Sequence, residues 1–183
     1  MKKFPILIFV VVMIWSCNSK SELLNNSTDI KIGEKFFDYD EIEYYSTNID
    51  EEKIGKLLDN QTKSEIDSIK MGVILDDIPN SISDLSFIEN LERIGYKKSK
   101  VDKSKFNDID KIFVEKSVKE ITATLCIYVY RDILIFKKEG KVVGTAKICF
   151  DCLAHQIKGT KVNTDNFGQD GDYGKLATIL RKL

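Results

Sequence analysis

The residues best suited to chemistry gather in the carboxyl-terminal third of the chain. Cys149 and Cys152 form a Cys-x-x-Cys pair, His155 follows closely, and Cys126 lies upstream. Thiols in such an arrangement form a disulfide, coordinate a metal ion or take part in thiol–disulfide exchange. The motif is therefore compatible with three kinds of site.

A structural disulfide between Cys149 and Cys152 is the favoured interpretation. Side chains three positions apart in a regular strand point to opposite faces and cannot bond. If Phe150 and Asp151 form the tip of a turn, however, the two ends approach to within about 7 Å, which overlaps the separation that a disulfide tolerates. We therefore expect these two cysteines to be oxidised to each other, with Cys126 left as a buried free thiol.

The other two interpretations use the same side chains. Cys126, Cys149, Cys152 and His155 are the ligand types of a structural zinc centre, although zinc motifs usually space two well-separated ligand pairs. Redox Cys-x-x-Cys motifs begin a helix, whereas this pair ends a predicted strand. We expect no catalytic residue and no cofactor, because His155 is the only histidine and neither a nucleophile elbow nor a phosphate-binding glycine loop is present.

The residues around the motif predict an antiparallel meander. Alternation of side-chain type indicates strands over residues 121–130, 133–138, 141–149 and 153–157. Glu139-Gly140 is typical of a two-residue hairpin turn, since glycine tolerates the positive φ that such a turn requires. The turn pairs Lys138 with Lys141, and a regular ladder then pairs Phe136 with Val143, Leu134 with Thr145, and Asp132 with Lys147. This register places one set of side chains together on a face that we expect to pack against the helices: Ile133, Ile135, Ala146 and Ile148.

Helical periodicity predominates before residue 120. A short β-like segment over residues 42–46 precedes stretches predicted as helices at residues 51–58, 64–74 and 105–115, and a further helix begins near Ser83 and ends at Gly95. Asp172 is expected to cap a final helix. The predicted fold class is α+β: a mainly helical amino-terminal half packed on a carboxyl-terminal antiparallel meander of three to four strands, with a closing carboxyl-terminal helix.

The amino terminus resembles the signal of an exported lipoprotein. Lys2 and Lys3 precede an apolar run over residues 4–15, which is shorter than the roughly 20 residues that span a bilayer. Ile14-Trp15-Ser16-Cys17 resembles a lipobox, which implies a diacylglycerol on Cys17, palmitate among its acyl chains, and cleavage before it. Ordinary secretion and an uncleaved anchor are the alternatives.

These features predict three segments. Residues 1–16 are expected to be a signal peptide, residues 17–30 a lipidated cysteine with a flexible tether, and residues 31–183 a single domain. Asn18 is not the aspartate that resembles an inner-membrane retention signal, which favours the outer membrane. The formal net charge is −1 and the lysines are interleaved with acidic residues, so no nucleic-acid partner is expected.

One resemblance to known proteins adds to this interpretation. The stretch YRDILIFKKEGKVVGTAKICFDC, followed by NFGQDGDYGKL, resembles a group of uncharacterised lipoproteins of Bacteroidota-type bacteria. Weaker similarity extends through FIENLERIGYKK and DKIFVEK. Their shared feature is a hairpin closing in Cys-Phe-x-Cys, matched here by Cys149, Phe150 and Cys152. The resemblance implies the lipid anchor and the hairpin, and it transfers no activity.

The functional expectation is a membrane-anchored envelope lipoprotein that acts as a non-enzymatic binding or interaction module. Its partner, a protein or a small molecule, is not indicated by the sequence. The alternative is a thiol-redox or metal-binding protein that uses the turn from Cys149 to Cys152.

Overall fold

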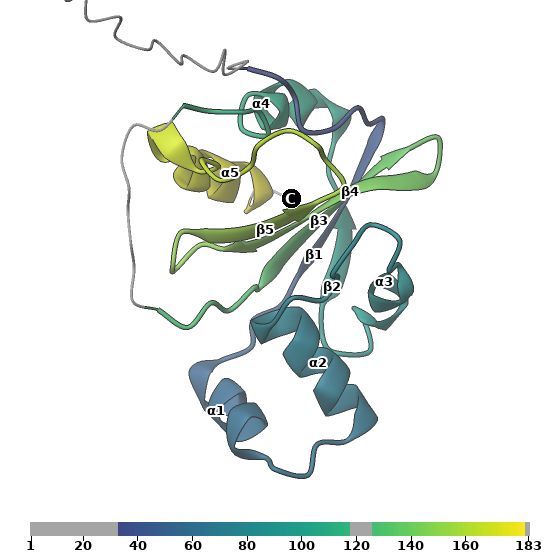
Figure 1. The fold of residues 1–183 in the computed structure, drawn as a ribbon, viewed down its shortest axis with the longest axis vertical. Helices are drawn as coiled ribbons and strands as arrows, with labels where there is room; N and C mark the ends of the chain where they lie inside the picture. Colours follow the sequence, from purple (N-terminus) through teal and green to yellow (C-terminus); the bar gives the residue numbers. More distant parts are fainter. Residues whose placement is uncertain (1–32, 118–125, 182–183) are drawn as a thin grey trace, which may run out of the picture. The chain divides into compact units, whose positions relative to one another are not determined.

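A five-stranded antiparallel sheet forms the centre of the protein in the computed structural model, which describes residues 33–117 and 126–181. The strand order is β2-β1-β3-β4-β5 (Figure 1). The strands are β1 (Glu41–Ser46), β2 (Lys97–Lys100), β3 (Asp132–Lys138), β4 (Lys141–Cys149) and β5 (Ala154–Lys158). The expected signal peptide, Cys17 and the expected tether lie outside the described residues.

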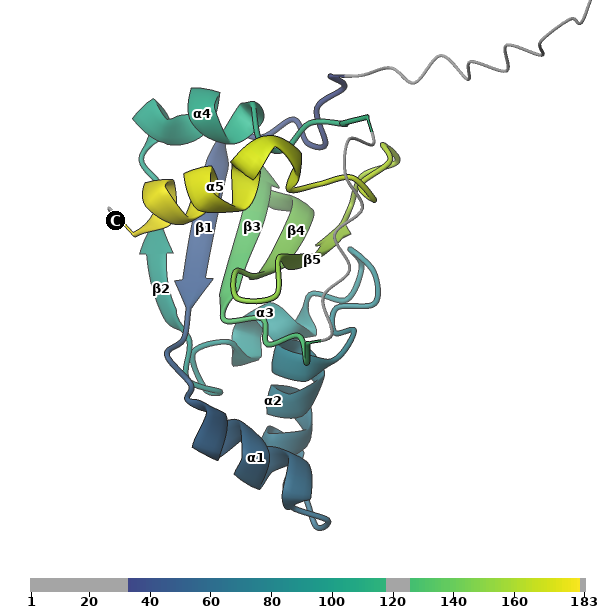
Figure 2. The same cartoon turned by 90° about the vertical axis from the view of Figure 1, so that its left-hand side faces the viewer.

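Short helices cover the sheet (Figure 2). They are α1 (Glu51–Asp59), α2 (Glu65–Leu75), α3 (Ser86–Asn90), α4 (Phe106–Asp110) and α5 (Asp172–Leu180). Asp50 and Ser64 cap α1 and α2, since each side chain accepts a hydrogen bond from the backbone N–H three residues later. Every helix within the two described stretches is too short or too polar to cross a membrane.

Two separate apolar cores show that both faces of the sheet are covered. On one face, Leu134 and Phe136 of β3 pack with Ile109 of α4 and Leu176 of α5. On the other face, the side chains that pack together come from β3 and from α1, α2 and α3: Ile133, Ile135, Ile54, Val73, Ile74 and Phe87. The strand β3 therefore alternates between two buried surfaces rather than between core and solvent.

The predicted fold class is wrong in its division of the chain into a helical half and a strand half. The amino-terminal half supplies β1 and β2, and β1 lies inside the sheet between β2 and β3. The physical reason lies in β1 itself, where Ile42 and Tyr44 enter one core while Tyr45 enters the other. A short strand buried on both faces has no clean alternation, so its place in the sheet was not evident from its pattern.

The predicted hairpin is confirmed at its turn but wrong in its register beyond it. Lys138 pairs with Lys141 as expected, and both Glu139 and Gly140 have positive φ, at 50° and 73°. A bulge between Phe136 and Lys137 then shifts the ladder, so that Phe136 pairs with Gly144 rather than with Val143, Leu134 with Ala146, and Asp132 with Ile148.

The shifted register changes which side chains share a face. Ala146 and Ile148 lie with Leu134 in the core beneath α4 and α5, whereas Ile133 and Ile135 lie in the other core. The expected single face of these four side chains is therefore wrong. One extra residue in one strand exchanges the two faces, because side chains alternate with a period of two.

Three local predictions also need correction. The predicted strand over residues 121–130 is irregular in its described part, residues 126–130, and its remainder lies outside the described residues. The helix predicted over residues 105–115 is limited to α4. Asp172 does not cap α5, because Gly171 occupies the cap position; Asp172 begins the helix and forms ion pairs with Lys116 and Lys175.

Candidate functional site

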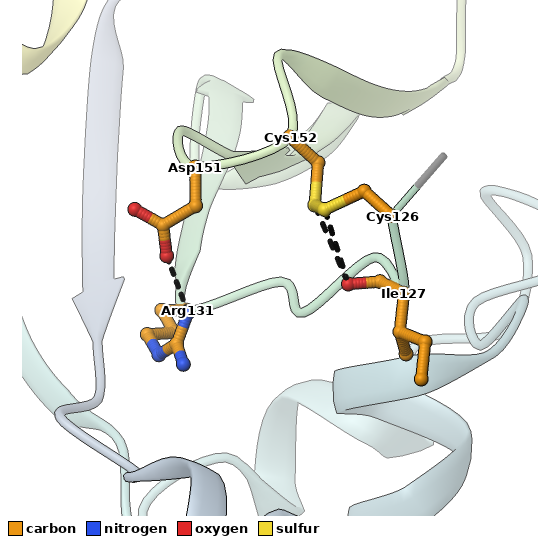
Figure 3. Close-up of a disulfide and its surroundings, with 5 residues drawn as sticks. All are labelled: Cys126, Ile127, Arg131, Asp151 and Cys152. Carbon is orange, nitrogen blue, oxygen red and sulfur yellow. Dashed lines mark hydrogen bonds and ion pairs between the residues drawn. A yellow bond between two sulfur atoms is a disulfide. The ribbon is translucent and has the colours of Figure 1, made fainter. Parts of the chain in front are cut away.

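A disulfide joins Cys126 to Cys152 at one end of the sheet (Figure 3). Their Cα atoms lie 5.9 Å apart, and 26 positions of sequence separate them. Cys149, the last residue of β4, is a free thiol and is buried. The structure thus brings together the three cysteines that the sequence singled out.

The predicted pairing of Cys149 with Cys152 is wrong in this structure, and so is the free thiol predicted at Cys126. Cys149 is still part of the β4–β5 ladder, where it pairs with Ala154, while Cys152 lies in the turn that follows. Cys126 belongs to no strand, so no ladder register restricts where its side chain points. The irregular segment from Cys126 to Arg131 can therefore bring its sulfur to the turn.

The register of the sheet shows where this site lies. Ser46, at the end of β1, pairs with Asp132 at the start of β3, and Asp132 pairs with Ile148 near the end of β4. The exit from β1 towards α1 and the turn that holds Cys152 therefore belong to the same end of the sheet.

A pocket of about 410 Å³ opens beside the disulfide; we call it the cysteine pocket. The helix α1 contributes Glu51, Ile54, Gly55 and Leu58 to its wall. The segment after the disulfide and the β4–β5 turn contribute the remaining lining residues: Cys126, Ile127, Val129, Arg131, Cys149, Asp151 and Cys152. Gly55 adds room, since a Cβ atom there would meet nothing within 4 Å.

Polar groups occur at the margin of this pocket. Arg131 Nη1 lies 2.8 Å from Asp151 Oδ2, and Arg131 Nε donates a hydrogen bond to the carbonyl oxygen of Ile49 at 3.0 Å. The sulfur atoms of Cys126 and Cys152 lie 3.7 Å and 3.4 Å from the carbonyl oxygen of Ile127. Arg131 thus links the β4–β5 turn to the connection between β1 and α1, while the disulfide links that turn to the segment before β3.

Exposed apolar side chains occur in the wall of the cysteine pocket and on residues that follow its lining residues in the chain. Leu58 and Ile127 line it and are 42% and 68% exposed. Tyr128 and Leu153, each a sequence neighbour of a lining residue, are 44% and 49% exposed. Leu85 is the one other large hydrophobic residue with such exposure in the described parts of the chain. Exposed apolar side chains at a pocket are typical of surfaces that contact another molecule.

Lys147 is a buried charged residue that the sequence prediction missed. Its side chain is fully buried, and Nζ donates hydrogen bonds to the carbonyl oxygens of Val73 (3.0 Å), Asp76 (2.5 Å) and Ile78 (2.8 Å) at the end of α2. Nζ also lies 4.5 Å from the centre of the Tyr130 ring, which packs with Cys149 and Cys152. Lys147 therefore joins the end of α2 to the cluster beneath the disulfide.

Burial shifts the pKa values of Lys147 and Tyr130. Loss of solvation lowers the pKa of Lys147 to about 7, although the nearby Asp77 and Asp76 oppose the shift. Burial likewise raises the pKa of Tyr130 to about 12, which keeps its hydroxyl neutral near neutral pH. A lysine between Ala146 and Ile148 in an apolar strand was the available signal, but the expected register put it on the face opposite the one expected to pack against the helices.

His155, the fourth candidate zinc ligand, lies apart from the cysteines. It pairs with Ile148, on the face beneath α5, whereas the adjacent pair of Cys149 and Ala154 belongs to the opposite face. Its Nε2 lies 3.0 Å from the carbonyl oxygen of Thr164, which can only accept, so Nδ1 accepts from the Tyr173 hydroxyl at 2.9 Å. Burial lowers the pKa of His155, which favours this neutral form. Within residues 33–117 and 126–181, no group of three His, Cys, Asp or Glu side chains is placed to hold a metal ion.

Comparison of this chain with models of protein families, with curated proteins and with solved structures finds no match.

Proposed function

We propose that this chain is an exported lipoprotein, anchored to the cell envelope through Cys17, whose folded domain is a non-enzymatic binding module for a partner protein. The observation that carries the proposal is the exposure of Leu58 and Ile127 in the wall of the cysteine pocket, together with exposed Tyr128 and Leu153 next to lining residues in the chain. The signal-like sequence before Cys17 supports export from the cytoplasm, and Asn18 favours the outer membrane as the final location.

The disulfide supports the export part of this proposal. Bonds of this kind form and persist outside the reducing cytoplasm. The bond between Cys126 and Cys152 closes a loop that returns to the sheet at β3, so it is part of the fold rather than of a free terminus. A domain with such a bond is suited to the compartment that the signal sequence predicts.

The direction of β1 separates the first described residue from the cysteine pocket. The described chain begins beside the segment that follows α4, where the N–H of Gly33 donates a hydrogen bond to the carbonyl oxygen of Glu115. From there β1 runs to the opposite end of the sheet, and α1 follows (Figures 1 and 2). Gly33, the first described residue, therefore lies at the end of the sheet opposite the cysteine pocket.

The size of the apolar surface favours a protein over a small ligand. A volume of about 410 Å³ accommodates a large side chain or a compact ligand. Tyr128 and Leu153 do not line the pocket, but each follows a lining residue in the chain and is exposed, so a partner protein that contacts these residues would reach further than a ligand inside the pocket. Binding energy in protein interfaces concentrates where an anchor side chain fills a pocket and surrounding contacts exclude water.

Site-specific photo-crosslinking tests the proposal in cells that export the full chain. A photoreactive benzoylphenylalanine replaces Ile127 in one protein and Leu85 in the control. Leu85 is distant in sequence from the pocket and, at 42% exposed, matches the exposure of Leu58. We expect a discrete adduct with another protein from position 127 that is absent from position 85 and is reduced about tenfold by Leu58→Glu.

Three outcomes would overturn the binding assignment. They are the same adducts from both positions, an adduct that Leu58→Glu does not change, and an adduct of two copies of this chain in place of a different protein. The parallel variant Leu85→Glu separates a local effect from a general loss of solubility, since it places the same charge on an equally exposed leucine elsewhere.

A thiol-redox role remains the second candidate, because three cysteines line one pocket and one of them is a free thiol. The placement of His155 on the other face gives no support to a metal site that combines it with the cysteines.

A further inference from the structure

We propose that Cys149 is an intramolecular exchange partner for the disulfide between Cys126 and Cys152. The Cys149 side chain is 1% exposed and packs with Cys152 and Tyr130 in one small buried cluster. All three cysteines line the same pocket. A free thiol held against one half of a disulfide is the arrangement that thiol–disulfide exchange requires.

The exchange conserves atoms and electrons. Cys149 loses its proton and, as a thiolate, attacks the sulfur of Cys152. A bond forms between Cys149 and Cys152 while the bond between Cys152 and Cys126 breaks. Cys126 leaves as a thiolate and takes up a proton. One disulfide and one thiol are present before and after the step, so no external oxidant or reductant is consumed.

The packing indicates which sulfur is attacked. Cys152 belongs to the buried cluster with Cys149, whereas Cys126 does not. Cys126 is exposed and lies on the segment before β3. Attack on Cys152, with Cys126 as the leaving group, is therefore the favoured direction.

The step would change the wall of the cysteine pocket. In the observed state the disulfide fixes Cys126, and with it Ile127, to the β4–β5 turn. After exchange that covalent link is lost, while Arg131 still joins the turn through Asp151. The exposed Ile127 would then be free of its covalent link to the turn, so the state of the disulfide would control the apolar surface. The exchange does not depend on the proposed binding function and is tested separately.

The first experiment uses the full mature chain with no denaturant. The protein is incubated between pH 6 and pH 8, quenched with acid, alkylated and mapped by non-reducing peptide mass spectrometry. We expect alkylated Cys126 to accumulate beside alkylated Cys149, and faster at pH 8 than at pH 6, because the thiolate is the attacking form in thiol–disulfide exchange. In Cys149→Ser, Cys126 should stay unlabelled. Label on Cys149 alone overturns the proposal, and label on Cys152 overturns the assigned direction.

The second experiment traps the product. Cys126→Ser is refolded in a glutathione redox buffer, and its circular dichroism is compared with that of the native chain. We expect a bond between Cys149 and Cys152 in the folded variant. The matched control, Cys149→Ser, should keep the bond between Cys126 and Cys152. If folded Cys126→Ser keeps two free thiols, or carries glutathione on Cys152 alone, the two side chains cannot reach each other and the proposal fails. If the variant does not fold, the labelling pattern of the native chain still decides.

Discussion

The Nζ atom of Lys147 lies 3.0 Å from the carbonyl oxygen of Val73, which places a lysine of the sheet directly against the end of α2. Two more carbonyl oxygens, of Asp76 and Ile78, accept from the same nitrogen. The last carbonyl groups of a helix lack partners within the helix, and a cation there is favoured by the helix dipole. The hydrogen bonds from Lys147 to these carbonyl oxygens therefore offset part of the free energy that burial of its charge costs.

Stability should depend on pH through Lys147. Its pKa is 10.5 in the unfolded reference and about 7 in the folded domain. Between these values the unfolded chain binds more protons, so the free energy of unfolding rises with pH, by at most about 1.4 kcal/mol per unit, and this contribution is flat below the folded pKa. The charged groups around Nζ are Asp76, Asp77 and Lys158, and Asp77 and Asp76 limit the rise by favouring the charged lysine.

Lys147→Met should remove this dependence. We expect it to lower the free energy of unfolding by ~2 kcal/mol, since three buried carbonyl groups lose their donor. The loss should be larger at pH 9 than at pH 6.5, because only the native protein gains stability in that interval. Urea unfolding followed by circular dichroism measures both. Parallel pH profiles for the two proteins would show that Lys147 does not titrate in this range.

The disulfide should stabilise the domain measurably. Closing a loop of this length contributes about 3.5 kcal/mol in the chain-entropy relation. We therefore expect Cys126→Ser and Cys152→Ala to lower the free energy of unfolding by ~3.5 kcal/mol, and dithiothreitol to lower that of the native protein similarly. Cys149→Ala serves as the control. If reductant destabilises Cys149→Ala much less than the native protein, the bond between Cys126 and Cys152 is not the stabilising one.

The hairpin turn should resist substitution for reasons of backbone conformation alone. Gly140 has a φ of 73°, and a Cβ atom built there meets nothing within 4 Å. Gly140→Val is therefore expected to cost ~1 kcal/mol or more, because a β-branched residue resists positive φ. Gly140→Asn should cost less, since asparagine tolerates this region. Equal unfolding free energies for the two variants would argue against the turn.

That turn shows how far local sequence could predict the fold. Glu139-Gly140 and the alternation beside it place β3 and β4 correctly, because a two-residue turn is fixed by its own residues. The extra residue at the bulge, Val143, is not marked by a turn sequence of this kind. Gly144 beside it was the available indication, since a glycine within a strand often marks a bulge. In the structure a Cβ atom at position 144 would overlap the ring of Phe37.

The sequence identified the cysteines of the site but not the disulfide that joins two of them. The sequence brings Cys149 and Cys152 to one turn because they are neighbours in the chain. Pairing with Cys126 depends on where the segment before β3 lies, which is decided by tertiary contacts such as the hydrogen bond from the Tyr130 N–H to the carbonyl oxygen of Ile74. Lys147 was missed for a related reason, since its burial depends on the bulge and on α2.

Substitution of Gly55 tests how much stability the helix α1 loses by having a glycine at the wall of the pocket. A helical glycine costs about 0.5–1 kcal/mol relative to alanine, and Gly55 has open space where a Cβ atom would stand. Gly55→Ala should therefore raise the free energy of unfolding by that amount. Gly72→Ala in α2 should gain less or lose stability, because its Cβ atom would overlap the Ile78 side chain. If thermal unfolding shows the reverse order, the packing described around these two glycines is incorrect.

Intact-mass and non-reducing peptide analysis of the full chain, recovered from the envelope of cells that export it, tests the lipid anchor and the disulfide together. We expect a chain that begins at an acylated Cys17, a peptide pair joined through Cys126 and Cys152, and Cys149 as the predominant alkylated thiol. An uncleaved amino terminus with an unmodified Cys17, or alkylation of all three remaining cysteines before reduction, would contradict it.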